Sequence, residues 1–126
     1  MNKLLVTDDE EILRMLIVDT LEDEGFDIDE ASDGEEALSF LEQKEYALLI
    51  LDYMMPKLTG LDVLKKVRAN PVTSNQKVLM LTAKGQAQDK QEMLDNGADS
   101  ILIKPFSPKE LVETVKDLID ASQNER

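Results

Sequence analysis

The chain has 126 residues, enough to bury a proper core, and we expect one domain over residues 1–126. Its 27 acidic residues outnumber its 14 basic ones, and the net charge of -13 disfavours binding to nucleic acid or to an anionic membrane surface. The chain has no cysteine and no histidine, so any chemistry must use carboxylates, hydroxyls and lysines.

The first quarter of the chain predicts two strands separated by a helix. Residues 3–7 form a short apolar run, and residues 26–31 alternate apolar and acidic side chains, as a half-exposed edge strand does. Between them we expect a helix that starts at Glu10 and ends near Gly25, since glycine is suited to a helix end. The expected inward face of this helix consists of Ile12, Leu13, Leu16, Ile17 and Leu21.

The middle of the chain continues this alternation. A turn and a helix at 32–43 precede residues 47–51, an unbroken apolar run that predicts a strand buried on both faces of a parallel sheet. A helix is expected at 60–70, and the polar, proline-containing stretch 70–76 predicts a surface loop.

The last part of the chain adds two strands and two helices. Strands are predicted at 77–81 and 100–103, with a weaker, more polar helix at 86–97 between them. The last helix begins with a capping box from Ser107 to Glu110. Five strands in strict alternation with helices predict an α/β fold in three layers, a doubly wound parallel sheet with helices on both faces.

Polar side chains that can bind ligands or react lie at the carboxyl ends of the predicted strands, which is where ligands bind in such sheets. Asp8 and Asp9 follow the first strand and Asp52 the third, while Thr82 and Lys104 end the fourth and fifth. Asp9, Thr82 or Lys104 alone would be better explained as a helix cap, a loop residue or a solvated charge. Their coincidence at one edge of the sheet favours a functional site.

Three carboxylates at one sheet edge repel one another, and a hard divalent cation relieves that repulsion. Mg²⁺ suits the position because it takes oxygen ligands and usually combines one or two carboxylates with a phosphoryl oxygen. The Thr82 hydroxyl and the Lys104 ammonium are suitable partners for an anion beside the metal. The set predicts phosphoryl transfer to Asp52, with Asp52, Thr82 and Lys104 as the catalytic residues.

These side chains lie in four stretches, LLVTDDEE, LLILDYMMPKLTGLDVL, VLMLTAK and GADSILIKPFSPKEL. In these stretches and along its whole length the chain resembles the receiver domains of response regulators in two-component signalling, in particular the stand-alone receivers of chemotaxis and sporulation. The resemblance implies a flavodoxin-like five-stranded sheet in the order 2-1-3-4-5 with five helices. It also implies a phosphorylation-dependent switch, in which Asp52 accepts a phosphoryl group from a histidine kinase or a histidine phosphotransfer protein.

The resemblance further implies a role for each site residue. Asp9, Asp52 and the backbone carbonyl of Met54 would bind Mg²⁺ directly, and Asp8 would bind it through a water molecule. The phosphoryl oxygens would be bound by Thr82, Ala83 and Lys104, and the Lys104-Pro105 peptide bond would be cis.

Signal output is expected to involve Thr82 and the position of Ile101. Receivers usually have an aromatic residue at that position, whereas Ile101 has no aromatic ring that could change orientation, and its β-branched side chain has few allowed rotamers. We therefore expect repacking of residues 82–88 and of the helix after them to carry the output.

The expected partners are the phosphodonor and an unknown downstream target protein. The last helix has no arginine before Arg126, so the dimer of receivers that drive DNA-binding domains is not supported, and we expect a monomer or a weak dimer without direct nucleic-acid binding. With no cysteine, signal peptide or membrane-length apolar stretch, the chain is expected in the cytoplasm.

Three other functions are compatible with parts of this pattern. A phosphatase of the haloacid dehalogenase type would need a second aspartate at the position of Met54, so a turnover enzyme is not expected. A flavin-binding module needs a phosphate loop after the first strand, where TDDEE would repel a phosphate. An interaction module that is never phosphorylated would not need the complete set of site residues.

Overall fold

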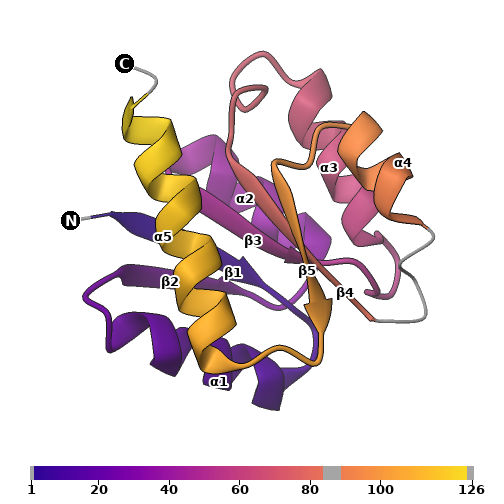
Figure 1. Ribbon diagram of the computed structural model, residues 1–126. Helices are drawn as coiled ribbons and strands as arrows, with labels where there is room; N and C mark the ends of the chain where they lie inside the picture. Colours follow the sequence, from indigo (N-terminus) through magenta and orange to yellow (C-terminus); the bar gives the residue numbers. More distant parts are fainter. Residues whose placement is uncertain (1, 84–88, 125–126) are drawn as a thin grey trace.

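The computed structural model describes residues 2–83 and 89–124, in which five strands alternate with five helices (Figure 1). The strands are β1 (Lys3–Thr7), β2 (Asp27–Ala31), β3 (Leu48–Asp52), β4 (Val78–Ala83) and β5 (Ser100–Lys104). The helices are α1 (Glu11–Glu22), α2 (Gly34–Gln43), α3 (Gly60–Ala69), α4 (Lys90–Asp95) and α5 (Pro108–Asn124).

The five strands form one parallel sheet in the order β2-β1-β3-β4-β5, which confirms the predicted flavodoxin-like α/β fold. The central strand β3 is buried along its whole length, whereas β2 at the edge is fully buried only at Ala31. The apolar run and the alternating run of the sequence thus correspond to a central and an edge position.

Helices cover both faces of the sheet and make it the middle of three layers (Figure 1). On one face α1 and α5 pack through Ile17, Leu21, Val115 and Ile119 against the side chains of β1, β3 and β4. On the other face α2 and α3 bury Ala37, Leu41, Val63, Leu64 and Val67, and Met93 of α4 joins them. Each layer therefore exists because its helices bury one apolar face against the sheet.

Side-chain caps start several helices. The Asp33 carboxylate accepts a hydrogen bond from the backbone N–H of Glu36 at the start of α2. The predicted capping box of α5 is confirmed, because Ser107 Oγ accepts from the N–H of Glu110 while the Glu110 carboxylate accepts from the N–H of Ser107. Such caps satisfy backbone donors that have no partner within the helix.

The predicted inward face of α1 is partly wrong. Ile17 and Leu21 are buried as expected, but Ile12 and Leu16 are 77% and 60% exposed. Leu13, Ile17 and Leu21 pack against the core, whereas Ile12 and Leu16 each come one residue before a member of this row and lie about 100° away from it around the helix axis. Apolar residues at helical spacing do not by themselves show which of two adjacent rows faces the sheet.

Two further predictions differ in extent. Helix α4 begins at Lys90, and the residues 84–88, which include the start of the predicted 86–97 helix and most of the expected output loop, lie outside the described residues. The predicted loop 70–76 is a series of turns in which Thr73 is buried and donates its hydroxyl to the carbonyl of Val67. In the described part of the chain, no helix is both long and apolar enough to cross a bilayer.

Replacement of Thr7 by valine is expected to stabilise the protein by about 1 kcal/mol, because a buried hydroxyl without a partner costs more than a methyl group of the same shape. Thr7 is fully buried at the end of β1, and within the described residues its Oγ1 has no hydrogen-bond partner. Urea unfolding of the two proteins measures the difference. A Thr7→Val protein less stable than the wild type would contradict the expectation.

Candidate metal and phosphoryl-acceptor site

Three carboxylates meet at the carboxyl edge of the sheet. Strands β1 and β3 are neighbours in register, with Thr7 opposite Leu51, so the residues that follow them lie side by side. Asp8, Asp9 and Asp52 each offer one carboxylate oxygen, and these oxygens lie within 4.8 Å of one another. Asp8 and Asp52 are buried and Asp9 is exposed, so the cluster opens to solvent on one side.

The two buried carboxylates are each only half satisfied. Asp8 Oδ1 accepts from the N–H of Glu10 at 2.9 Å, and Asp52 Oδ1 accepts from Lys104 Nζ at 2.7 Å. Among the described residues, Oδ2 of Asp8 and Oδ2 of Asp52 have no hydrogen-bond partner. Buried polar atoms are rarely left in this state, and an ion is one of the usual reasons.

Burial dominates the electrostatics of the cluster. It raises the pKa of the Asp8 carboxyl from 3.8 to about 6, against the hydrogen bond from Glu10 and with the help of the nearby charge of Asp52. Burial also raises the pKa of Asp52 above its ordinary value, although the hydrogen bond and the charge of Lys104 oppose that change. A carboxylate pair of this kind gains most from an added positive charge.

The donor set fits a hard divalent cation. Three carboxylates converge, two of them buried and each with one oxygen that has no partner among the described residues, and the exposed Asp9 leaves room for water ligands. Mg²⁺ accepts such a set, because it uses few carboxylates and keeps several waters.

The other predicted residues stand on neighbouring strands. Lys104 ends β5 opposite Ala83 of β4, with Thr82 beside it, so both strand ends face the edge that carries Asp52. The Thr82 hydroxyl is buried and makes a long contact of 3.5 Å to the carbonyl of Ala83. The Lys104-Pro105 peptide bond is cis, as the resemblance implied.

Two predicted residues stand apart from the carboxylate cluster. The side chain of Met54 is 60% exposed just after β3, so only its backbone is a candidate ligand. Ile101 is partly buried against the core under α2 and α3, opposite Met80 in the sheet. The roles assigned to Met54, Ala83 and Ile101 stay predictions.

The sequence interpretation missed Arg14. Its guanidinium donates from Nη1 to the backbone carbonyl of Asp8 at 2.7 Å and from Nε to Glu30 at 3.0 Å. The available signal was a single arginine one turn into the helix that follows two acids, which by itself does not identify the acceptor.

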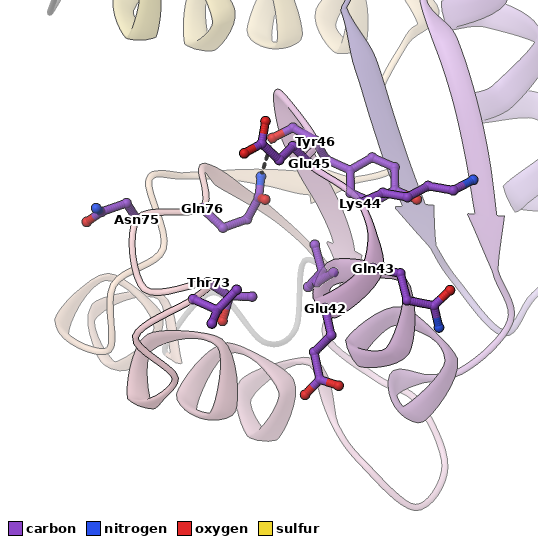
Figure 2. Close-up of a pocket in the computed structure, with 10 residues that line it drawn as sticks. Glu42, Gln43, Lys44, Glu45, Tyr46, Thr73, Asn75 and Gln76 are labelled. Atoms are coloured by element: carbon purple, nitrogen blue, oxygen red, sulfur yellow. Dashed lines mark hydrogen bonds between the residues drawn. The ribbon is translucent and has the colours of Figure 1, made fainter.

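A separate hollow of about 620 Å³ lies at the opposite edge of the sheet, between the end of α2 and the segment before β4 (Figure 2). Its lining includes Glu42, Tyr46, Thr73 and Gln76, and the Gln76 amide donates to the backbone carbonyl of Tyr46. None of the carboxylates of the cluster lines it. The hollow is therefore not part of the candidate site.

Fold and site together define a receiver domain of two-component signalling, and the comparison with known families agrees. Residues 4–116 match the response regulator receiver domain, so the chain belongs to that family. Its members are switches in phosphorylation-dependent two-component signalling.

Several proteins are similar to this chain. The transcriptional regulatory protein SrrA of Staphylococcus aureus is 41% identical over 123 residues, which are 98% of this chain and 50% of SrrA. The chain thus spans about half the length of the curated relatives it matches.

Solved structures agree in fold. The chemotaxis protein CheY4 of Vibrio cholerae has a TM-score of 0.87 and 35% identity, covering 94% of this chain and 98% of CheY4. The receiver domain of the Francisella response regulator 1452 has a TM-score of 0.89 and 35% identity, covering 97% of this chain and 99% of that one.

Proposed function

We propose that Asp52 is the phosphoacceptor of this receiver domain. It takes a phosphoryl group from a phosphohistidine of a sensor kinase or a phosphotransfer protein in the cytoplasm and thereby changes how the domain binds a target protein. The observation that carries the proposal is the state of the Asp52 carboxylate, which is buried beside Asp8 and Asp9 and bonded through Oδ1 to Lys104, while its Oδ2 has no partner within residues 2–83 and 89–124.

The transfer is a displacement at phosphorus. A carboxylate oxygen of Asp52 forms the new bond to phosphorus, the bond from phosphorus to the donor imidazole nitrogen breaks, and the leaving imidazole takes up a proton. The protein contributes position and charge rather than proton transfer, which agrees with a chain that has no histidine.

Asp8, Asp9 and Asp52 would hold Mg²⁺ together with the carbonyl of Met54. When bound, the ion supplies positive charge between the carboxylates and the incoming phosphoryl oxygens. The ammonium of Lys104, already 2.7 Å from Asp52, is in reach of a phosphoryl oxygen on that side chain. The Thr82 hydroxyl and the N–H of Ala83 would bind the others, so the charge of the product would be met by the ends of β4 and β5 together with the metal ion.

The phosphohistidine of the donor would lie outside this chain, which contains no histidine. We assign its contact to the exposed face of α1 formed by Ile12, Met15 and Leu16, which begins three residues after Asp9. An apolar helix face beside the acceptor suits a helix that presents its phosphohistidine to the site. The domain would act as a switch and not as an enzyme that turns over a substrate. Met54 occupies the position at which a phosphatase of the haloacid dehalogenase type has its second aspartate.

Acetyl phosphate with Mg²⁺ is expected to phosphorylate the wild-type protein and to leave Asp52→Asn unmodified. The substitution keeps the shape of the side chain and removes the nucleophilic carboxylate. Intact-protein mass spectrometry should show one added phosphoryl group, with Asp120→Asn, an exposed aspartate of α5, as the matched control. A phosphoryl group retained in the Asp52→Asn protein would refute the assignment.

A further inference from the structure

We propose that Arg14, anchored by Glu30, is a positioning residue that orients the peptide between Asp8 and Asp9 for cation binding. The inference rests on the proposed function, because it concerns the Mg²⁺ site that this function uses. It adds a residue outside the carboxylate cluster, on the opposite side of the peptide that joins the two acids.

The Arg14 guanidinium bridges two elements. From the first turns of α1, Nη1 donates to the carbonyl oxygen of Asp8 at 2.7 Å, and Nε donates to Oε1 of Glu30 on β2 at 3.0 Å. The side chain of Arg14 is only 16% exposed, whereas that of Glu30 is 46% exposed. A planar fork with acceptors at two of its edges has little freedom to rotate.

Three of the four hydrogen-bonding groups of Asp8 have partners among the described residues. Its N–H donates to the carbonyl of Ala31, its Oδ1 accepts from Glu10, and its carbonyl accepts from Arg14. The remaining atom, Oδ2, is buried without a partner in the described part of the chain. The two backbone bonds fix the main chain at Asp8, and the bond from Glu10 fixes the carboxylate, which in this position contributes to the cluster with Asp9 and Asp52.

The hydrogen bond from Arg14 affects Asp9 because its acceptor is the backbone carbonyl of Asp8. The Asp8 carbonyl belongs to the peptide that links Asp8 to Asp9, and a peptide unit is planar, so a bond to its oxygen fixes the plane from which Asp9 departs. Asp9 is exposed, and its carboxylate need not accept a hydrogen bond for this control to operate. Arg14 therefore limits the directions in which the Asp9 carboxylate can point.

Arg14 acts through geometry rather than through charge. It bonds a carbonyl and not a carboxylate of the cluster, and its charge is already matched by Glu30. The charges that act most strongly on the Asp8 carboxyl are those of Asp52, Lys104 and Glu10. A lysine at position 14 would keep the charge but lose the fork, which separates the two explanations experimentally.

The test is Mg²⁺ affinity measured by isothermal titration calorimetry on the full chain, with amide chemical shifts of Asp9 as a second readout. Arg14→Met is expected to weaken Mg²⁺ binding roughly tenfold, in the range found when groups that orient metal ligands are removed. Glu30→Ala should weaken it less, and the double variant should bind no more weakly than Arg14→Met, because Glu30 acts through Arg14. Arg14→Lys should stay close to Arg14→Met.

The control is Lys3→Met, which removes an ion pair between Lys3 of β1 and Asp27 of β2 at the amino ends of these strands, far from the carboxylate cluster at the carboxyl edge. It should leave Mg²⁺ affinity unchanged, so an equal loss in Lys3→Met would show a merely structural effect and overturn the inference. Full recovery in Arg14→Lys would overturn it in favour of charge. If Arg14→Met does not fold, Arg14→Lys and Glu30→Ala still decide.

The same titration separates this inference from the proposed function. Wild-type binding that is lost in Asp9→Asn but unchanged in Arg14→Met would leave the proposed metal site intact and refute the role of Arg14. Wild-type binding that does not depend on Asp9 would refute the metal site itself and the inference with it.

Discussion

Replacement of Asp8 by asparagine is expected to stabilise the metal-free protein by about 2 to 3 kcal/mol at about pH 7. Asp8 is fully buried, and burial together with the charge of Asp52 raises its pKa from 3.8 to about 6. A rise of this size corresponds to about 3 kcal/mol between the two protonation states. Asparagine can keep the hydrogen bond from Glu10 without the buried charge.

The effect has a defined pH dependence. Because the pKa of Asp8 is higher in the folded protein, the folded state binds more protons than the unfolded state between about pH 3.8 and 6. The stability linked to this group is complete below the unfolded value and is lost as pH rises through the folded one. The advantage of Asp8→Asn should therefore grow from near zero at about pH 4 to its full size at about pH 7.

Urea unfolding in EDTA at a series of pH values measures the difference between the two proteins. Asp120→Asn changes the net charge equally at an exposed position and should show little of this dependence. Added Mg²⁺ should reduce the difference, since the ion stabilises only the protein that keeps its ligands. A constant difference across the pH series would contradict the assignment to Asp8.

Replacement of Gly60 by alanine is expected to destabilise the protein by about 3 kcal/mol. At an ordinary helix position the same replacement stabilises the helix by about 1 kcal/mol. Gly60 begins α3, and its N–H donates to the carbonyl of Tyr53 at 2.8 Å. A Cβ at this position would collide with the backbone carbonyl of Asp52 and lie 2.8 Å from Cα of Tyr53. Backbone atoms cannot move aside as a flexible side chain can.

The control for Gly60→Ala is Gly25→Ala. Gly25 has a φ of +92° but nothing within 4 Å of an added Cβ, so its replacement should cost only about 1 kcal/mol of backbone strain. Urea unfolding compares the two. In addition, only Gly60→Ala should slow phosphorylation by acetyl phosphate, because it displaces the end of β3. Equal stability losses would refute the packing argument.

Local patterns in the sequence were sufficient for the strands, the helices and the parallel α/β class, whereas the strand order was expected only from the resemblance to receiver domains. The unbroken apolar run before Asp52 and the acidic alternation at 26–31 identify a central and an edge strand, and the structure has them there. Strict alternation of strands and helices then places all carboxyl ends at one edge, because parallel strands share a direction. This is why Asp8, Asp52 and Lys104 could be grouped before any coordinates were known.

Contacts between segments were decided only by the tertiary structure. The exposure of Ile12 and Leu16 depends on which face α1 turns toward the core, and the bond from Arg14 to the Asp8 carbonyl depends on how α1 lies beside β2. The unsatisfied hydroxyl of Thr7 likewise depends on its neighbours in the core. Residue type and periodicity report local preference, whereas partners and clearances are set by the packing of elements far apart in the chain.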